Sequence, residues 1–292
     1  MNDLTKNAGV SLEERDGVLW LHLPQGEFGA YHFGANVARP FFYPLRGPGQ
    51  IAVTRDALDL NETDHKHHRS LFSAYEEANE ANNWNEEPGH GFTRHQKFLD
   101  KKEGKEFGGF TAQGLWTNSE GDPVLTETRR IRLYNAGDEI RLFDYDITFS
   151  ATHGDVTFGE TKEAGVLGVR VAPSMNGSVG GMITNSNGGR GEADCWGKKA
   201  AWCDYSGEVE GEIMGITIFD HPSNPNSPTR WHVRDYGLFA TNPFSTAAFG
   251  AGQASPFLLT DGTSVKFAYR VLIHRDYLKA QQTQDFYKKW VC

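Results

Sequence analysis

The stretch VKFAYRVLI, residues 265–273, places a large apolar side chain at every second position, with Lys266 and Arg270 between them. Side chains of a β-strand point alternately to its two faces, so this pattern is typical of a strand with one buried face. The stretch FDYDITF, residues 143–149, repeats the alternation with acidic and threonine side chains on its polar face. Both stretches therefore predict half-buried strands.

Strand patterns recur along most of the chain and are separated by turn sequences rich in Gly, Asn and Asp. Shorter candidate strands are residues 18–23, 129–134, 166–169 and 212–219. Helical spacing of apolar side chains is clear only from Asp276 to the end, with Asp276 as the expected N-cap. The sequence therefore predicts an all-β fold, one antiparallel sandwich or barrel over residues 1–292, with a short C-terminal helix.

The composition excludes several classes of protein. The 292 residues carry a formal net charge of −9, so no nucleic-acid-binding surface is expected. The sequence has no run of about 18 apolar residues, so we expect no membrane span. Residues 1–6 lack the apolar core of a signal peptide, and the three cysteines are an odd number without regular spacing. We therefore expect a cytoplasmic protein without a disulfide framework, and no nucleotide cofactor because phosphate-loop and dinucleotide motifs are missing.

The segment DHKHHR, residues 64–69, holds three of the eleven histidines of the chain. Imidazole binds metals and transfers protons near neutral pH, so we interpret the segment as an active or binding site, with a solvated polar loop as the alternative. In an extended conformation, His65 and His67 share one face and His68 lies on the other. This arrangement predicts a divalent metal ion held by His65 and His67 with a distant carboxylate. His68 is a candidate catalytic base and Arg69 a candidate substrate contact.

Thr161-Lys162-Glu163 precedes an apolar run that we interpret as a strand. Glu163 is a candidate general base, and Lys162 is a candidate for holding a developing negative charge. Because neighbouring strand residues point to opposite faces, we expect at most one of the two in a given pocket. A surface ion pair is the alternative.

Further candidate contacts combine aromatic and polar side chains. In RWHVRDYG, residues 230–237, His232, Arg234 and Tyr236 share one face of an extended chain, which suits a polyol or carboxylate pocket. A solvent-facing strand surface is the alternative. The remaining candidates are Trp84, whose ring can stack on a sugar, His221 in a sharp turn, and Arg39 and Arg46, which flank an aromatic turn.

Together these segments resemble a bacterial family labelled PmoA-like, after a methane oxygenase subunit. The matching segments are residues 39–48 (RPFFYPLRGP), 64–71 (DHKHHRSL), 161–163 (TKE), 220–224 (DHPSN) and 231–238 (WHVRDYGL). The chain departs from the family pattern at Lys66, where proline is usual, and in the acidic loop after Leu71. The resemblance implies an antiparallel β-supersandwich, similar to galactose mutarotase-like carbohydrate enzymes, with a small carbohydrate as the substrate.

The resemblance also implies a reaction. Members look like companions of sugar oxidoreductases, which implies a lyase or hydrolase that cleaves oxidised (3-keto) glycosides by proton abstraction and elimination. A divalent metal ion, Lys162, Arg69 or Arg234 would hold the enolate oxygen. His232 or His221 would protonate the leaving oxygen. Two alternatives remain: a sugar epimerase or mutarotase with a His/Glu acid–base pair, and a non-catalytic carbohydrate-binding protein.

Overall fold

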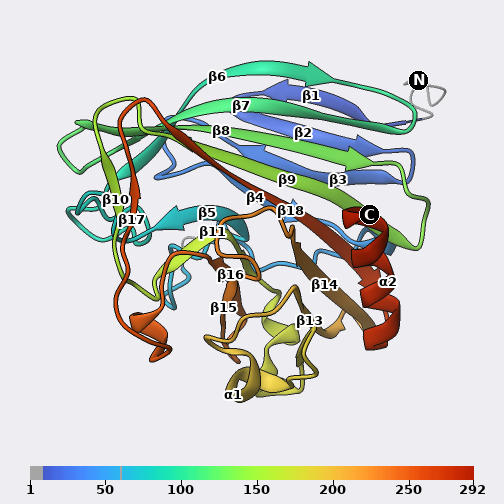
Figure 1. Ribbon diagram of the computed structural model, residues 1–292. Coiled ribbons are helices and arrows are strands. Elements are labelled where there is room, and N and C mark those ends of the chain that lie inside the picture. The colour runs from blue at the N-terminus through green and yellow to red at the C-terminus, as the bar shows by residue number, and fades with distance from the viewer. Residues whose placement is uncertain (1–8, 60) are drawn as a thin grey trace.

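Two eight-stranded antiparallel sheets face each other and form the body of the molecule (Figure 1). The computed structural model describes residues 9–59 and 61–292. The first sheet has the strand order β1-β2-β3-β4-β5-β11-β16-β15, and the second has the order β12-β13-β14-β18-β9-β8-β7-β6. A two-stranded sheet, β10-β17, lies at one end of the sandwich. The expected all-β, antiparallel fold with a C-terminal helix is confirmed.

The strands of the first sheet are β1 (Ser11–Arg15), β2 (Val18–Leu23), β3 (Gly26–His32), β4 (Phe41–Leu45), β5 (Leu71–Tyr75), β11 (Ala164–Arg170), β15 (Arg230–Val233) and β16 (Leu238–Asn242). Those of the second sheet are β6 (Phe92–Lys102), β7 (Phe107–Thr117), β8 (Pro123–Tyr134), β9 (Ile140–Ser150), β12 (Met182–Asn185), β13 (Trp202–Val209), β14 (Glu212–Asp220) and β18 (Ser264–Arg275). The remaining elements are β10 (Val156–Phe158), β17 (Phe257–Leu259), the helices α1 (Gly191–Cys195) and α2 (Ala280–Val291), and the 3₁₀ turns η1 (Pro48–Gln50), η2 (Pro173–Met175), η3 (Gly177–Val179) and η4 (Ala247–Phe249).

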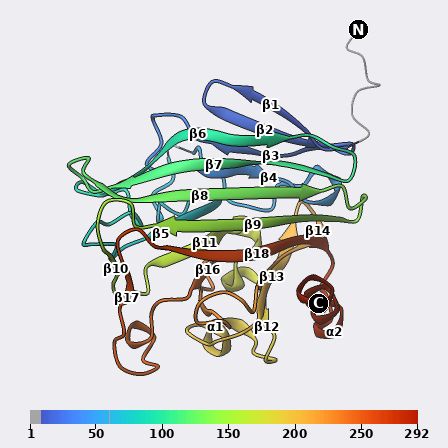
Figure 2. The same ribbon diagram turned by 45° about the horizontal axis from the view of Figure 1, so that its top comes forward.

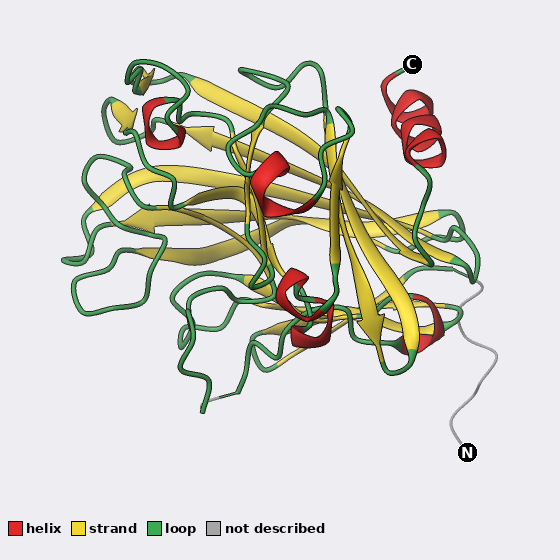
Figure 3. Cartoon of the chain, turned by 90° about the horizontal axis from the view of Figure 1, so that it is seen from below, coloured by secondary structure: helices red, strands yellow, loops and turns green. Residues whose placement is uncertain are grey.

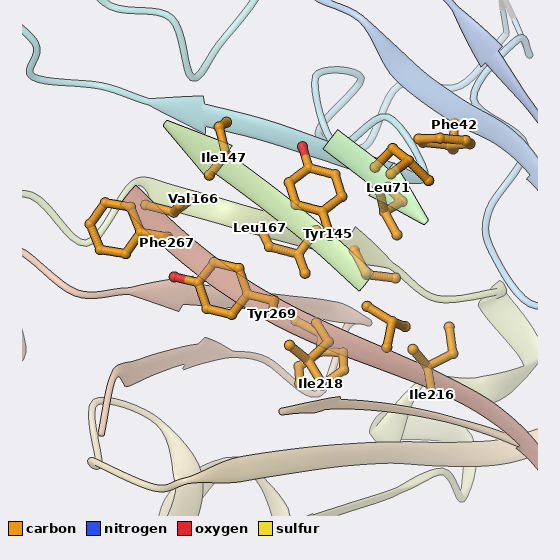
Figure 4. Packing of buried hydrophobic residues seen from close by; sticks show 14 of the residues in the cluster. Phe42, Leu71, Tyr145, Ile147, Val166, Leu167, Ile216, Ile218, Phe267 and Tyr269 are labelled. Atoms are coloured by element: carbon orange, nitrogen blue, oxygen red, sulfur yellow. The ribbon is translucent and has the colours of Figure 1, made fainter. Parts of the chain in front are cut away.

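The main core fills the space between the two sheets. Strands β9 and β18 pair with each other in the middle of the second sheet, and their alternating apolar side chains are buried, as their sequences predict. Tyr145 and Ile147 of β9 and Phe267 and Tyr269 of β18 pack against Leu71 and other residues of the first sheet (Figure 4). The polar positions of these strands therefore face outward, because successive side chains alternate.

A second apolar cluster covers the outer face of the first sheet. Phe41, Phe72 and Leu238 belong to this cluster, whereas their immediate neighbours along the strands belong to the main core. Gly168 of β11 makes room for the ring of Phe72, because a Cβ atom at Gly168 would lie 3.1 Å from that ring. The loops that follow β4 and β5 carry the three clustered histidines, Arg69 and Trp84.

Helix α2 packs against the outer face of the second sheet at one end (Figure 3). Phe286, Tyr287 and Trp290 contact this sheet, as their helical spacing predicts. The expected N-cap at Asp276 is wrong: the cap is Lys279, and Asp276 has a φ of 59°, outside the helix. In the described part of the chain, no helix is long and apolar enough to cross a membrane.

Candidate active site

The histidine segment forms a tight turn immediately before β5. The backbone N–H of His68 donates a hydrogen bond to His65 O at 2.9 Å, and His65 has a φ of 45°. The ring centroids of His67 and His68 are 4.5 Å apart, and those of His65 and His68 are 4.9 Å apart. The segment is therefore not extended, and the turn gathers all three imidazoles instead of dividing them between two faces.

A buried arginine holds the backbone of this turn. The guanidinium of Arg55 donates to the carbonyl oxygens of Asp64, His65 and His68, at 2.6, 2.7 and 3.0 Å. A buried carbonyl oxygen without a partner is costly, so these hydrogen bonds stabilise the turn. Arg55 is not among the predicted site residues, because no local pattern connects it with carbonyl groups in the later turn.

Two further arginines fasten the loop after β5 to the turn. Arg39, which is 1% exposed, donates to the carbonyl oxygens of His67 and of residues 83–85, and to Glu86 Oε1 at 3.1 Å. Arg69 donates to both oxygens of Glu86, at 3.0 and 2.5 Å. All nitrogens of Arg39 are engaged within the protein, so the structure makes it a positioning residue and leaves it no donor for a substrate.

The loop after β5 places Trp84 against the imidazoles. The Trp84 ring is buried, and its centroid lies 5.3 Å from that of His68 and 6.0 Å from that of His67. It stacks on His232 of β15 at 6.2 Å, with an angle of 21° between the rings. Trp84, predicted as a sugar contact, therefore forms the wall that keeps the histidine rings in place.

The hydrogen bonds of His68 determine where its proton lies. Arg170, at the end of β11, donates to His68 Nδ1 at 3.2 Å and to Asp64 Oδ2 at 2.6 Å. Arginine is only a donor, so Nδ1 accepts and the proton of the neutral ring is on Nε2. Burial, with the charges of His67 and Arg170, holds the pKa of His68 well below its ordinary value. Its Nε2–H group is buried and has no partner among the described residues.

His232 is the second imidazole with unsatisfied nitrogens. It is 1% exposed, and neither ring nitrogen has a well-formed hydrogen bond within residues 9–59 and 61–292. Burial lowers the pKa of His232 to about 4, although the nearby Glu163 carboxylate acts in the opposite direction. Burial and the charge of Arg39 likewise lower the pKa of His67 to about 4. These rings are therefore neutral at pH 7.

Glu163 is the carboxylate of this group. It lies within electrostatic range of His67, His232 and Tyr236. Lys162 Nζ donates to Glu163 Oε1 at 2.5 Å, so the ion pair that was the alternative in the sequence analysis is present. The expectation that the two side chains diverge is wrong, because β11 begins only at Ala164 and both residues precede the strand.

Tyr236 completes the cluster from the turn after β15. Its ring stacks on His65 with centroids 5.0 Å apart, and the guanidinium groups of Arg170 and Arg234 lie 4.8 and 5.3 Å from its centroid. Burial raises the pKa of Tyr236 to about 12, so its hydroxyl remains protonated at pH 7. Arg234 Nε lies 2.9 Å from Glu192 Oε1 of α1, and that ion pair positions the turn.

Two predicted substrate contacts do not join the cluster. Arg46 pairs with Glu27 of β3 at 2.9 Å and donates to Gln50 O. His221 follows β14 of the second sheet, with its ring centroid 4.9 Å from that of Trp290 in α2. Both residues were predicted together with the residues of the cluster. Their own strands place them in other parts of the molecule.

The predicted metal ligands have other surroundings. His65 Nδ1 is hydrogen-bonded to Asp64 Oδ1. Across the residues that the structure describes, no group of three or more His, Cys, Asp or Glu side chains is arranged to hold a metal ion. A divalent metal ion at His65 and His67 therefore stays a prediction, and it would need further ligands from water or substrate.

Several solved structures share part of this architecture at low similarity. Galactose 1-epimerase from Lactobacillus acidophilus NCFM is 8% identical with a TM-score of 0.43, covering 92% of this chain and 98% of that protein. A β-arabinopyranosidase is 9% identical with a TM-score of 0.41; the match covers 86% of this chain but only 39% of that enzyme's length. A GalM/aldose epimerase homologue from C. elegans is 8% identical with a TM-score of 0.36, covering 92% and 100%. Such values identify neither a substrate nor a reaction for this chain.

Sequence comparison is more specific about the family. No curated protein matches the chain. A family model matches residues 21–288, which is most of the sequence, and nothing in the comparisons supports the PmoA label. The chain belongs to DUF6807, a family of unknown function.

Proposed function

We propose that this chain is a carbohydrate-active enzyme that removes a proton beside the ketone of an oxidised (3-keto) glycoside and eliminates the glycosidic oxygen. One observation carries the reaction: the buried, neutral rings of His68 and His232 both pack against Trp84, and each has a ring nitrogen without a well-formed hydrogen bond, as far as the described residues extend. Glu163 lies within electrostatic range of His232. Buried polar groups are normally hydrogen-bonded, so such nitrogens indicate a place for polar atoms of a ligand. The carbohydrate class comes from the resemblance of the sequence motifs.

The proposed reaction uses the carboxylate as a base and the imidazoles as donors. Glu163 takes the proton from the carbon next to the ketone, and the electron pair of that C–H bond forms an enolate. The enolate oxygen accepts hydrogen bonds from His68 Nε2–H and from the N–H of His232. The enolate then expels the glycosidic oxygen from the adjacent carbon, and the proton on Glu163 passes to that oxygen.

The neutral state of the rings suits this role. An imidazole with a pKa of about 4 does not carry a charge at pH 7, so it donates a hydrogen bond without needing a counter-ion in a buried site. The Lys162 ammonium donates to Glu163 and fixes the orientation of the carboxylate that serves as the base. His67 and Tyr236 are only partly buried, so we expect the substrate to enter beside them.

The test is turnover of a 3-keto p-nitrophenyl glucoside. Release of p-nitrophenolate is followed spectroscopically, and the reaction in D₂O is followed by NMR for exchange at the carbon beside the ketone. We expect acceleration over buffer, and a Glu163→Gln variant that loses about 10²–10⁴-fold in kcat with little change in KM. Glu80→Gln is the matched control, because Glu80 is an exposed acid in the loop after β5.

Other results would replace the proposal. Equal rates with and without the protein, together with faster interconversion of sugar anomers, would identify a mutarotase. Binding of the keto-glycoside without turnover, and with the affinity unchanged by Glu163→Gln, would identify a carbohydrate-binding protein.

A further inference from the structure

One carboxylate holds the loop between β16 and β17, which is drawn in orange in Figure 2. Glu160 Oε2 accepts hydrogen bonds from the backbone N–H groups of Thr246 and Ala248, at 2.9 and 3.3 Å. Glu160 Oε1 accepts from the N–H of Ser255 at 2.9 Å. These donors lie at the two ends of residues 246–255, so a single side chain closes the loop.

The charge of Glu160 strengthens this closure. Partial burial raises the pKa of Glu160, but the backbone N–H groups outweigh burial and hold the pKa below its ordinary value. The carboxylate is therefore ionised at pH 7, and hydrogen bonds to an ionised acceptor are stronger than those between neutral groups.

The same loop is tied to the backbone that leads to Glu163. Ser245 Oγ donates to Thr161 O at 2.5 Å and accepts from Thr161 N at 3.1 Å. Asn242, at the end of β16, donates to the same oxygen at 2.8 Å. Glu160 and Thr161 therefore connect the loop with the residues immediately before the proposed base.

The loop carries Phe249 to the histidine cluster. The Phe249 side chain is 8% exposed, and its ring meets His232 edge to face with centroids 6.3 Å apart. Phe249 also meets Trp196, with centroids 5.2 Å apart. Gly197, with a φ of 69°, leaves room for this ring, since a Cβ atom there would lie 3.0 Å from Phe249 Cδ1. Two aromatic rings, Trp84 and Phe249, thus pack against the imidazole of His232.

These contacts connect the carboxylate with the imidazole. Ala248 directly precedes Phe249, so its hydrogen bond to Glu160 fixes the backbone that carries the Phe249 ring. His232 is 1% exposed and lacks well-formed hydrogen bonds within the described residues. Water that reached the ring would solvate its charged form, so the neutral state of His232 depends on the exclusion of water.

We propose that Glu160 is a positioning residue, which keeps the Phe249 ring against His232 and thereby keeps water away from the imidazole. The benefit to catalysis rests on the proposed function, in which His232 donates to the enolate, because hydrogen bonds are stronger where water is excluded. The connection from Glu160 through Phe249 to the burial of His232 does not depend on that reaction.

The first test needs no substrate. NMR titration of the His232 ring, with the signal assigned by its loss in His232→Phe, gives the pKa in each variant. We expect about 4 in the wild type and a pKa higher by at least about 1 in Glu160→Gln and in Phe249→Ala, because water then reaches the ring. Glu77→Gln is the matched control with no expected change, since Glu77 is an exposed acid whose backbone oxygen accepts from Gly159 N, beside Glu160.

A double variant separates positioning from general loosening of the loop. If Glu160 acts through Phe249, we expect Glu160→Gln/Phe249→Ala to raise the pKa of His232 no more than Phe249→Ala alone. Circular dichroism checks that each variant is folded. Where Glu160→Gln is not, Glu160→Asp, which keeps the charge but is shorter, serves in its place with a smaller expected rise.

Turnover of the keto-glycoside is the second test. We expect kcat of Glu160→Gln to fall about tenfold with KM changed less than about twofold, because the substrate still binds but one donor is less well placed. If the wild type itself does not turn the compound over, the proposed reaction fails, and the titration alone decides the role of Glu160.

Two results would overturn the proposal. One is a pKa of His232 that is the same in Glu160→Gln as in the wild type. The other is a double variant in which the pKa rises by the sum of the two single effects, since Glu160 would then act independently of Phe249.

Discussion

His232 and His274 are buried to almost the same extent, at 1% and 2% exposure, but their surroundings are opposite. His274 lies on the outer face of the second sheet, where Nε2 is 2.8 Å from Asp204 Oδ2 and Nδ1 meets the carbonyl oxygens of Arg275 and Asp276. Oxygen acceptors surround the ring and raise its pKa above the ordinary value despite burial, with Asp204 as the main cause of the rise. Neither ring nitrogen of His232 makes a well-formed hydrogen bond within the described residues, although the backbone of Lys162 is nearby, and burial lowers the pKa of His232 to about 4.

The comparison separates a structural histidine from a candidate functional one. The oxygens of Asp204 also accept hydrogen bonds from Ser206 at 2.6 Å and from Thr217 at 2.7 Å, so that group is complete without a ligand. The group around His232 and His68 is incomplete, and a protein retains such a group where a ligand completes it. Burial alone does not distinguish the two histidines; the satisfaction of their hydrogen bonds does.

The largest effect is expected from breaking the complete group. Asp204→Ala leaves His274 Nε2 and two hydroxyl groups buried without their acceptor, so we expect the free energy of unfolding to fall by about 3–5 kcal/mol. Urea denaturation measures this loss, and Glu163→Gln is the reference with an expected change below about 0.5 kcal/mol. If Asp204→Ala lowered the free energy of unfolding no more than Glu163→Gln does, the group around His274 would not be the structural group described here.

Filling the incomplete group with an apolar ring is the reverse experiment. His232→Phe keeps an aromatic partner for Trp84 and removes two unsatisfied nitrogens, so we expect stability to be unchanged or raised by about 1 kcal/mol. Turnover of the keto-glycoside is expected to fall about 10²-fold, because one donor to the enolate oxygen is lost. Full activity in this variant would show that His232 takes no part in the reaction.

The pH dependence of stability sharpens the comparison. The pKa of His232 is lowered from 6.5 to about 4 in the folded protein. As the pH falls, the unfolded chain therefore binds a proton at this histidine at a higher pH than the folded chain does. The stabilising contribution of neutral His232 is complete above pH 6.5 and is lost as the pH falls toward 4, about 2 kcal/mol by pH 5. His274 has a raised pKa, so its contribution is complete below pH 6.5 and is lost as the pH rises through the folded-state value.

Denaturation at pH 7.5 and pH 5 tests this sign. We expect the wild type to lose about 2 kcal/mol more than His232→Phe over this interval, because the variant lacks one lowered pKa. Identical losses would mean that His232 is protonated in the folded protein near its ordinary pKa, and the neutral-donor role would fail with it.

The smallest effect is expected from removing metal ions. The proposed roles of His68, His232 and Glu163 do not require a metal, so we expect treatment with a chelator to change turnover less than about twofold. Elemental analysis of the wild type and of a His65→Ala/His67→Ala variant is the companion measurement. The predicted metal site would be established instead by two results together. The wild type would contain a stoichiometric divalent ion that the variant lacks, and adding that ion would restore the activity of the chelator-treated wild type.

The strand pattern was readable from the sequence because it is local. Val265 to Ile273 and Phe143 to Phe149 alternate with a period of two, and both segments bury the expected face in the main core. The pattern identified the class of fold and the polar faces. The predicted helix N-cap at Asp276 was wrong, because Asp276 has a left-handed backbone conformation and the helix begins only after Lys279.

The candidate site was only partly readable from the sequence. Histidines, a carboxylate and an aromatic turn are visible as motifs, and the structure brings together the ones around His68, Glu163 and His232. Arg55 and Arg170 were missed, because each acts on the histidine turn from a distant position in the chain.

The sequence by itself determined which residue types are available and which segments alternate as strands, since both depend on neighbouring positions. Only the tertiary structure decided that three histidines gather in one turn, that Arg39 is a positioning residue, and that His221 lies on the other sheet. The physical reason is that hydrogen-bond partners and burial come from strands far apart in the chain. The pairing of these strands decides which polar groups have hydrogen-bond partners within the protein and which remain free to bind a ligand.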